Sequence, residues 1–596
     1  MKLARFWRTV SHLSGEQLIY WFVCAGKRIL MGFLPTLMKK YITYLAFRLP
    51  TIETTNPPLI KMANTVLMFQ RAVYGISSAD IRSGKFTLLN QTFDFGAVEK
   101  VCWRGDFMEG DNPLRRMNLA YMGYIVPLLA NGEDDDIKIV CQLIRGLEEQ
   151  NPWSISGVFR DVWNPYTVSH RLVNLLCGLA VFQQAGGKAN PILENKIFNH
   201  IRFCAAFVNF NLERHLQYNH LFKNYVALAV FASAANKKTF RFKFLEKAIK
   251  KGIRQTILPD GGHVERSPMY HFLAIMDFDI LRASRIFSKE FSCLLEKTQQ
   301  RMVSALHGVS HPDGEIALFN DSWLGETPSV FHFIKPNSFS GTFRLNDTGY
   351  VRIGKKDEAV LFDCGPCGPN QNPAHGHADF LSVEVSLAGD RLVVDPGVAT
   401  YTSGPLRDIT RSAENHNGPY LVGVEPVEFW KSFRVGKRAY AKGIRSQGLS
   451  KIAPLWCAGC QNGYTNLGVG TRRFVGLWPG EGLLICDLIF GSTKYNAQAS
   501  FLIAKDWKLV NDNEITFIKD QQSVFVKPLI GDLGKIGKGS YWPRFGLENI
   551  GHTLTVSFER KRSKQMAAVI LSWKDSFTPP SHKIINKVFD NLIEND

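Results

Sequence analysis

The feature that most constrains the fold of this chain is a change in the spacing of its apolar residues near residue 340. From about residue 60 to 335, apolar residues recur every three to four positions in successive segments, among them 168–186, 191–210 and 270–287. This spacing gives each segment one apolar helical face, and short breaks with Pro, Gly or Asp separate the segments. This part therefore predicts an α/α toroid, or an incomplete barrel, of antiparallel helix pairs.

Beyond residue 340 the chain consists of short runs that alternate or are rich in β-branched residues, such as 349–354, 381–387 and 482–490. Gly, Asp, Asn and Lys turns separate these runs, which is the pattern of an antiparallel β-sandwich. Because 596 residues exceed what one hydrophobic core organises, we predict two large domains. The predicted units are a basic amphipathic segment 1–60, a toroid domain 61–338 and a β-sandwich domain 339–596.

The net charge narrows the choice of partner. A formal charge of +18 and an isoelectric point of about 9.3 favour an anionic partner, such as an acidic polysaccharide or a phospholipid surface. Nucleic acid is not favoured, because the sequence has no zinc-finger spacing, no RNP-like aromatic signature and no lysine-rich tail.

Two cysteine pairs have CxxC spacing, Cys364–Cys367 and Cys457–Cys460. They suggest either a four-thiolate zinc site or, for the first pair, a redox dithiol. However, about ninety residues separate the pairs, and the first runs into Gly-Pro-Asn-Gln-Asn-Pro, which does not open a helix. We therefore predict ordinary, partly buried cysteines.

The first fifty residues are strongly basic, with eight Lys or Arg residues and one acid, Glu16. The apolar run 18–26 stops at Lys27-Arg28, which is too short for a membrane span, and no small-residue cleavage site follows. Two alternatives stay open: a helix that lies on an anionic membrane, and a basic amphipathic helix packed on its own domain. Without a clear export signal, a cytoplasmic or inner-membrane location is favoured over the periplasm.

The stretch "NPAHGHAD" places His375, His377 and Asp379 just before an alternating run. Leu381, Val383, Val385 and Leu387 share one face of that run, and Ser382, Glu384 and Ser386 share the other, so a half-buried strand is predicted. An HxH pair has two interpretations: two capping or surface histidines, or one metal ligand beside one ring that faces a substrate.

Hairpin pairing alone does not build a metal site here. A turn at residues 388–390 returns the chain and places Asp395 opposite Val383 rather than opposite His377.

Several polar breaks in the helical region are ambiguous one by one. Asn219-His220 starts an apolar helix, where an Asn cap is the simple explanation. A Gly-rich loop precedes Tyr270, Arg171 lies one turn into another helix, and Asp321 lies in "LFNDSW".

Taken together, these strings carry a resemblance. Tyr270 follows "ERSPM", the "NH" pair lies fifty residues upstream, and "HGHAD", "VVDPG" and "RSAENHN" follow in that order. This order resembles the heparinase II/III family, which shares its architecture with alginate and oligoalginate lyases. The resemblance extends from about residue 114 to about 560.

The resemblance implies a lyase that cleaves a uronic-acid polysaccharide by β-elimination. The substrate would be heparan sulfate-like, alginate-like or a bacterial exopolysaccharide. Removal of the C5 proton needs donors that hold the neighbouring carboxylate while negative charge develops. Asn219 and His220 match the family's Asn-His pair and would supply these donors, whereas Arg171 and Arg266 receive no role.

Tyr270 matches the family's catalytic tyrosine and would move protons. A phenol has a pKa near 10, so positive charge must lie nearby before it acts as a base. His375 matches the first histidine of HGH and would be a second base or a carboxylate partner, depending on the stereochemistry of the substrate. Tyr401 lies where some relatives carry a second tyrosine.

His377, Asp395 and His416 match the family's metal ligands. Two imidazoles and a carboxylate suit Zn²⁺, although another divalent cation is an alternative. The ion is expected to brace the strands and the loop that carries His375 rather than to perform the elimination.

Two other classes of function compete. A glycoside hydrolase on the same toroid would use paired carboxylates, with Asp260, Glu265, Asp313 and Asp321 as candidates. The other is a non-catalytic polysaccharide-binding protein of an exopolysaccharide assembly system. The basic N-terminus adds the hypothesis that the polymer is handled at the inner membrane; the identity and sulfation of the polymer, endo or exo cleavage and the oligomeric state stay open.

Overall fold

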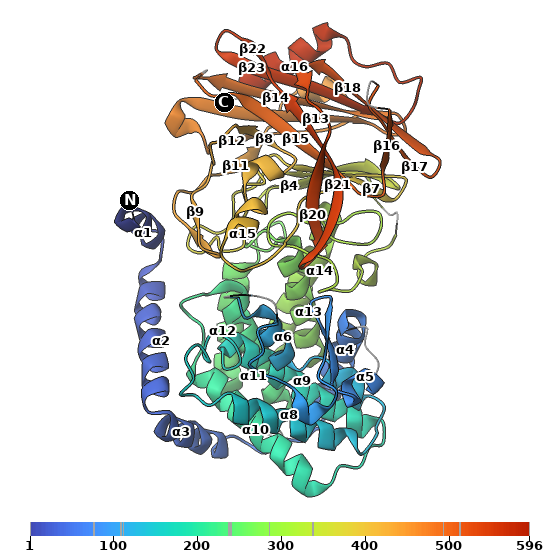
Figure 1. Cartoon of the computed structure of the whole chain (residues 1–596). Coiled ribbons are helices and arrows are strands. Elements are labelled where there is room, and N and C mark those ends of the chain that lie inside the picture. Colours follow the sequence, from blue (N-terminus) through green and yellow to red (C-terminus); the bar gives the residue numbers. More distant parts are fainter. Residues whose placement is uncertain are drawn as a thin grey trace.

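A computed structural model shows an N-terminal helical domain below a C-terminal domain of two packed sheets (Figure 1). It describes residues 2–74, 78–107, 110, 112–235, 241–284, 286–336, 339–492, 494–511 and 514–594. This arrangement confirms the predicted order of a helical part and an antiparallel β part. Closure of the helices into a toroid stays a prediction.

The helical domain is organised around α9 (Pro165–Gln184), most of whose side chains are buried. Asn164 caps this helix and Pro165 fills its first position, which is a favourable start for a helix. The helix packs against α4, α10 and α11, so its apolar faces are covered on several sides. The helices of the domain are α4 (Pro57–Tyr74), α5 (Ser78–Arg82), α6 (Leu114–Tyr121), α7 (Ile125–Leu129), α8 (Asp136–Gln150), α10 (Pro191–Phe210), α11 (Tyr218–Ala234), α12 (Arg241–Thr256), α13 (Pro268–Ser284) and α14 (Lys289–Ala305).

One apolar segment of the helical domain is broken where its periodicity alone suggests continuity. Residues 114–130 form α6 and α7, with Met122 in the left-handed region at φ 55° between them. A Cβ on the following Gly123 would lie 2.4 Å from the ring of Tyr74, so the close approach of α4 requires glycine there. The hairpin β1 (Lys85–Leu88) and β2 (Gln91–Asp94) is the sheet structure of this domain within the described residues.

The C-terminal domain contains two antiparallel sheets. The ten-stranded sheet has the order β19-β21-β15-β7-β6-β5-β4-β3, with β20 on β21 and β8 on β15. Its strands are β3 (Ser340–Leu345), β4 (Tyr350–Lys355), β5 (Glu358–Asp363), β6 (Val383–Leu387), β7 (Asp390–Val393), β8 (Pro419–Leu421), β15 (Ala497–Ile503), β19 (Asp532–Leu533), β20 (Gly537–Arg544) and β21 (Leu547–Ser557).

The nine-stranded sheet has the order β11-β12-β13-β14-β23-β18-β17-β16, with β22 on β23. Its strands are β11 (Ala441–Gly443), β12 (Leu455–Gln461), β13 (Val469–Trp478), β14 (Gly482–Gly491), β16 (Lys508–Asn511), β17 (Thr516–Lys519), β18 (Gln522–Ile530), β22 (Glu559–Lys561) and β23 (Lys564–Ser572). The small pair β9 (Phe429–Trp430) and β10 (Arg434–Val435) and the helix α15 (Pro405–Ile409) lie in the loops.

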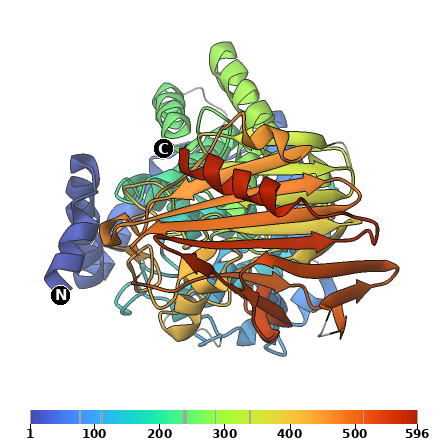
Figure 2. The same ribbon diagram turned by 90° about the horizontal axis from the view of Figure 1, so that it is seen from above.

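Apolar side chains from both sheets form one core between them, to which Val383, Phe501 and Val569 belong. The outer face of the nine-stranded sheet is covered by α16 (His582–Glu594), whose Ile585 and Phe589 pack on Leu484. Figure 2 shows this helix lying across the strands. The domain is therefore a sandwich with a third, helical layer on one side.

The prediction of a half-buried strand at 383–387 is wrong, because β6 is buried on both faces. Glu384, on the face opposite the sandwich core, accepts a hydrogen bond from the Leu318 amide at 2.6 Å and contacts His311 Nε2 at 2.9 Å. The segment that leaves the helical domain thus covers this face of the sheet. The register of β6 and β7 contains a bulge and pairs Val385 with Val393. Asp395 lies beyond the end of β7, so its place opposite Val383 stays a prediction.

The N-terminal residues form three helices rather than one: α1 (Lys2–Val10), α2 (Gly15–Phe33) and α3 (Pro35–Phe47). They run along one flank of both domains (Figure 1); we call this segment the N-terminal strap. Within the described residues, no single helix is long and apolar enough to cross a membrane, although α2 and α3 together pass that test as a pair bent by 112°.

Candidate active site

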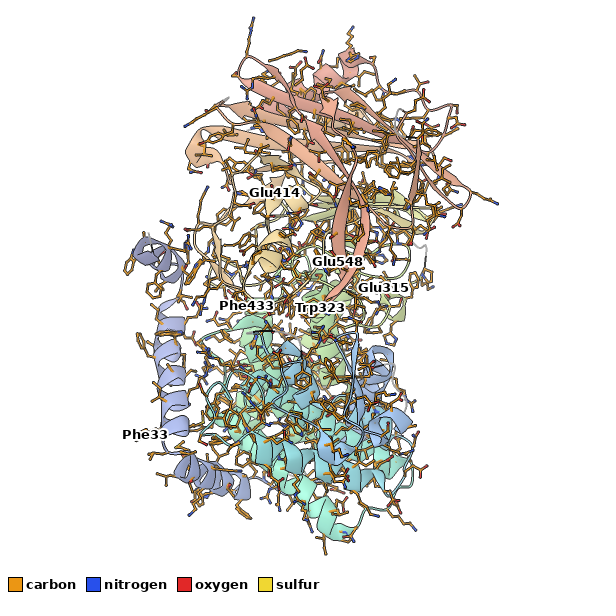
Figure 3. The ribbon with its side chains drawn as sticks, viewed as in Figure 1. Phe33, Glu315, Trp323, Glu414, Phe433 and Glu548 are labelled. Atoms are coloured by element: carbon orange, nitrogen blue, oxygen red, sulfur yellow. The ribbon has the colours of Figure 1, made fainter. Side chains whose placement is uncertain are left out.

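The candidate site lies where the helical domain meets the ten-stranded sheet. Trp323 and Phe433, labelled in Figure 3, mark this junction. Tyr270 reaches it from the first turn of α13, and His375 reaches it from the loop between β5 and β6. Their ring centroids are 4.2 Å apart. A phenol of the helical domain and an imidazole of the sheet domain therefore lie together, as expected if the two residues that match the family serve one reaction.

Local sequence explains how Tyr270 is held. The Ser267 hydroxyl accepts a hydrogen bond from the Tyr270 amide at 3.2 Å, and Pro268 follows as the first helical residue. The Ser267 hydroxyl also donates to the Asp321 carbonyl at 2.7 Å. Arg266 has φ 57°, a strained conformation of the kind that gathers near functional sites.

The two histidines of HGH share one carboxylate, which the sequence did not assign to them. Asp321 contacts His375 Nδ1 through Oδ2 at 3.0 Å and His377 Nε2 through Oδ1 at 2.9 Å. Arg407 donates to the same two oxygens, at 2.8 and 2.5 Å. The Asp321 side chain is fully buried. One buried carboxylate thus orients both imidazoles.

Electrostatics keep this carboxylate ionised. Burial raises the pKa of Asp321, but the charge of Arg407 and the hydrogen bonds from both histidines outweigh it, so the pKa lies well below its usual value. Asp321 is therefore an acceptor and no proton donor. With Nδ1 of His375 donating to it, Nε2 of His375 is left as an acceptor.

Two features of the backbone fit the histidines into this place. Asn320, in the left-handed region at φ 56°, accepts a hydrogen bond from the His377 amide at 2.8 Å through its side chain. A Cβ on Gly376 would lie 1.8 Å from the Cys367 carbonyl oxygen, so only glycine fits between the histidines.

A second tyrosine adjoins the first. The hydroxyls of Tyr270 and Tyr401 are 3.5 Å apart, and the Arg407 guanidinium lies 4.8 Å from the Tyr401 ring centroid. Burial and the neighbouring Tyr401 raise the pKa of the Tyr270 phenol well above its usual value. The expectation that positive charge favours the phenolate of Tyr270 is therefore not met in this state. Tyr270 is a protonated phenol.

Asn219 and His220 are the second and third residues of α11. The cap explanation for Asn219 fails, because Gln217 is the cap residue and Asn219 donates to the Tyr166 hydroxyl at 3.4 Å. Gln217 and Tyr218, at the start of α11, have φ of 60° and 41°, so the backbone is strained here as it is at Arg266. His220 Nδ1 lies 3.2 Å from the Glu213 carboxylate.

The charge of His220 depends on this carboxylate. Burial lowers the pKa of His220, but Glu213 more than offsets it, so the pKa is raised above its usual value. Glu265 lies within electrostatic reach of both His220 and His375: burial raises its pKa and the two imidazoles oppose the rise. His220 of the helical domain and His375 of the sheet domain therefore act on the same carboxyl group.

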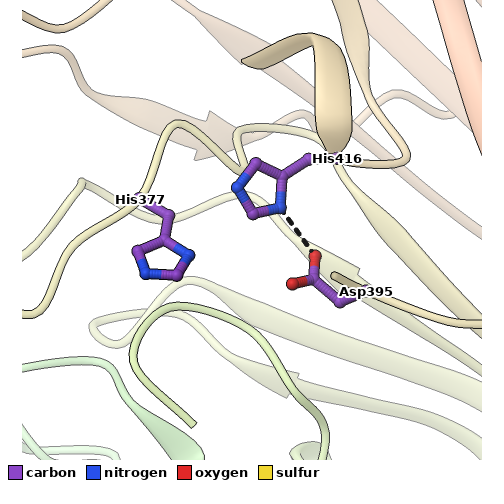
Figure 4. Close-up of side chains that lie close together, drawn as sticks. All are labelled: His377, Asp395 and His416. Atoms are coloured by element: carbon purple, nitrogen blue, oxygen red, sulfur yellow. Dashed lines mark hydrogen bonds and ion pairs between the residues drawn. The ribbon is translucent and has the colours of Figure 1, made fainter. Parts of the chain in front are cut away.

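His377, Asp395 and His416 form the predicted cluster (Figure 4). Their candidate ligand atoms lie within 4.8 Å of one another, and all three residues are buried. His416 Nδ1 contacts Asp395 at 2.8 Å. His377 Nδ1 and His416 Nε2 are buried and have no hydrogen-bond partner among the described residues. Orphaned imidazole nitrogens beside a carboxylate fit a divalent cation.

The other acids and arginines have structural partners. Asp260 accepts from the Asp347 and Thr348 amides, and Asp313 pairs with Arg391. The Arg171 guanidinium donates to the carbonyls of Ala120 and Val162. The Arg266 guanidinium donates to the carbonyls of Asp347 and Thr348. Asp260 and Asp313 are thus held by structural contacts, whereas Glu265 lies within electrostatic reach of Asp321, whose carboxylate is held by both histidines and Arg407.

The CxxC pairs do not join a metal cluster. Among the described residues, the one group of His, Cys, Asp and Glu side chains that fits a metal is that of His377. Burial raises the pKa of the Cys367 thiol to about 12, which opposes a reactive thiolate.

Comparison with known families decides the assignment. The heparinase II/III N-terminal description matches residues 146–343, and the heparinase II/III-like C-terminal description matches residues 340–569. The chain belongs to the heparinase II/III family. This confirms the interpretation of the chain as a polysaccharide lyase that acts by β-elimination.

Solved structures of this family share the fold. A heparinase III aligns with a TM-score of 0.63 at 14% identity over 94% of this chain and 91% of its own. The heparan sulfate lyase HepC from Pedobacter heparinus aligns with a TM-score of 0.53 at 16% identity over 84% of this chain and 83% of its own. No curated protein matches the sequence.

Proposed function

We propose that this family member eliminates across the C4–C5 bond of a uronic acid unit in a glycosaminoglycan-like polymer, with His375 as base and Tyr270 as acid. Two contacts of His375 carry this assignment. Its Nδ1 contacts the buried, ionised Asp321, and its ring centroid lies 4.2 Å from that of Tyr270. The substrates of the solved lyases, heparan sulfate among them, support the choice of polymer.

The base role follows from tautomer and position. Asp321 holds Nδ1–H of His375, so Nε2 accepts the C5 proton, and the carboxylate stabilises the imidazolium that forms. His375 is 11% exposed in its side chain, whereas Asp321 is fully buried, so the imidazole and not the carboxylate meets the sugar.

The acid role of Tyr270 follows from its position beside His375 and from its protonated state. A protonated phenol beside the site donates its proton to the leaving glycosidic oxygen, and the resulting phenolate regains a proton from His375 or from water. Tyr401 lies close enough to bond the phenolate oxygen. This division of labour needs no free phenolate before the reaction.

Asn219 and His220 would hold the uronate carboxylate. The Asn219 amide and the imidazolium favoured by Glu213 are donors in a partly buried place, where they stabilise the charge that develops at C5 and on the carboxylate. The pair stands on the helical side of the site, opposite the loop that carries His375.

The adjacent positions of base and acid favour one stereochemistry. Tyr270 and His375 lie ring to ring, so they reach the same face of a bound sugar. In a D-glucuronate unit linked through O4, the C5 hydrogen and the leaving oxygen lie on one face, so syn elimination fits. An L-iduronate unit places them on opposite faces. We therefore propose glucuronate-containing polymers as the preferred class.

His377, Asp395 and His416 would hold Zn²⁺ or another divalent cation. The ion would supply fixed positive charge that braces β7 and the loop of His375. Asp321 contacts His377 Nε2, which orients that ring toward the cluster.

The test is an assay of a polymer panel by ultraviolet absorbance, because elimination leaves a C4–C5 double bond conjugated to the carboxylate and hydrolysis does not. The panel comprises heparan sulfate, heparin, chondroitin, hyaluronan, dermatan, alginate and bacterial capsule polymers. Absorbance should rise with glucuronate polymers, and Tyr270→Phe should lose about 10²–10⁴-fold in rate. Tyr495→Phe, in the sandwich, is the matched control.

Cleavage without new absorbance would refute elimination. Full activity of Tyr270→Phe would refute the role of Tyr270 even if elimination were seen. Faster cleavage of dermatan than of hyaluronan would refute the syn geometry alone.

A further inference from the structure

The N-terminal strap presents its apolar side chains outward. Among the described residues, 25 large hydrophobic side chains are exposed, and 14 of them lie between Phe6 and Phe47. A helix on a globular protein turns its apolar face inward, so this distribution is the inverse of the usual one. A continuous exposed surface of this kind marks a contact with a partner or a membrane.

The helical periodicity of α2 shows that this exposure is a face and not scattered residues. Gln17, Cys24 and Met31, spaced by seven, are buried against the helical domain. The outward face carries Ile19, Phe22, Val23, Ile29, Leu30 and Phe33, with exposures from 41% to 81%. Phe33 lies on the outer side of the strap in Figure 3.

The inner side of the strap is fixed to the protein by polar contacts. Lys27 donates to the Phe210 carbonyl at 2.6 Å, and Glu16 pairs with Lys251 at 3.0 Å. Arg8 pairs with Glu428 of the sheet domain at 2.8 Å. The strap is therefore docked on both domains, and its apolar outward face stays exposed in this docked position.

α3 continues the surface with aromatic and basic side chains. Leu37, Tyr41, Tyr44 and Phe47 are exposed between 44% and 69%. Lys40 lies in the same helix, and Arg48 is the residue directly after it. Tyrosines and basic residues at the border of an apolar face are suited to the headgroup region of a bilayer.

A groove beside α3 adds positive charge. It has a volume of about 910 Å³ and lies between α3, α8 and α10. Its charged lining comprises Lys39, Lys138, Arg145, Lys196, Arg202, Glu148 and Glu149. Lys138 pairs with Asp135 and Arg145 pairs with Glu149, so the excess of positive charge comes from Lys39, Lys196 and Arg202. Anionic headgroups are the chemistry that such a border attracts.

We propose that the N-terminal strap is a membrane-binding surface that lies flat on an anionic bilayer. The apolar face of α2 enters the headgroup and acyl boundary, and the cations of α3 and its groove contact the lipid phosphates. A flat orientation follows from the polar contacts that hold the inner side of α2 on the helical domain. Because the strap contacts both domains, the bilayer also fixes the orientation of the site.

Vesicle flotation tests this proposal with the full chain. The wild type should float with vesicles of phosphatidylcholine and 30% phosphatidylglycerol, and binding to pure phosphatidylcholine should be about tenfold weaker. Phe22→Ser with Phe33→Ser should reduce binding to the anionic vesicles by about a hundredfold. The matched control is Val510→Ser with Ile550→Ser, two exposed side chains of the sheet domain at 56% and 57%.

The control should float like the wild type, and unfolding temperatures should confirm that both variants are folded. The proposal is overturned if the wild type does not float, if the strap variant floats as well as the control, or if both vesicle types bind equally. It is also overturned if light scattering shows a dimer that the strap substitutions dissociate, because a second copy would then cover the surface. None of these readouts requires lyase activity, so they are independent of the proposed reaction.

Discussion

The two arms of the candidate site are built differently. The helical arm places Asn219, His220 and Tyr270 on the first turns of α11 and α13, beside the aromatic ring of Tyr166. The sheet arm places His375 and His377 on a loop, where a buried ion pair of Asp321 and Arg407 fixes them.

This difference determines how far the effect of a substitution spreads on each arm. Helix starts position Asn219 and Tyr270 by backbone geometry, so a substitution of either residue removes one group and leaves the others in place. His220 is the exception on this arm, because it is paired with the buried Glu213. A buried charge network has no such independence, because removal of one partner leaves an uncompensated charge. We therefore expect losses on the helical arm to be local and losses on the sheet arm to affect activity, metal and stability together.

The largest effect is expected for Asp321→Asn. This change leaves Arg407 buried without its anion and frees both histidines, so kcat should fall about 10³–10⁴-fold. The free energy of unfolding should fall by about 3–5 kcal/mol. Kinetics and denaturant unfolding measure the two effects. A variant of normal stability and activity would show that the network does not control the sheet arm.

The matching change on the helical arm is Asn219→Ala. Removal of one donor to the uronate should lower kcat by about 10²–10³-fold. Metal content and unfolding temperature should stay near the wild-type values, because the side-chain hydrogen bond of Asn219 within the described residues is a long one to the Tyr166 hydroxyl. A loss of metal in this variant would contradict the independence of the arms.

A smaller effect on activity is expected for His377→Ala. The bound metal measured by mass spectrometry should drop below one ion per chain, and activity should fall about 10–100-fold because the loop of His375 loses its brace. Zinc content of the wild type identifies the ion. Full metal content in His377→Ala, with His416→Ala as a second variant, would refute the cluster as the site.

The smallest effect concerns pH. The pKa of folded His220 is raised, so the pair with Glu213 stabilises the fold fully below the usual histidine pKa and loses this contribution as pH rises through the raised value. The stability difference between the wild type and Glu213→Gln should shrink by about 1 kcal/mol from pH 6 to pH 9. A difference that grows with pH would reverse the sign we assign.

The sequence predicted the parts of this comparison that rest on periodicity and ordered strings. The change of period near residue 340 indicated the two classes of structure, and the order of "HGHAD", "VVDPG" and "RSAENHN" carried the family resemblance that implied the cluster of His377, Asp395 and His416. Their meeting with Tyr270 depended on the family resemblance, since no local pattern relates residues a hundred positions apart.

The supporting network was not predictable from the sequence. Asp321 stood in a short polar break and was assigned to hydrolysis, and no string singled out Arg407. Both acquire their roles only when the loop after β5, the segment before β3 and α15 come together in the fold. The burial of Glu384 was missed for the same reason, because alternation does not reveal what covers the second face of a strand.

The most direct test of the central claim is a double-substitution cycle with Tyr270→Phe and His375→Ala. The readout is the rate at which ultraviolet absorbance increases on the polymer that the wild type cleaves fastest. If the phenol of the helical arm and the imidazole of the sheet arm act in one elimination on one sugar, the double variant should be no slower than the slower single variant within about threefold. Losses that multiply, so that the double variant falls by the product of the two single effects, would show that the groups act independently and would contradict the account.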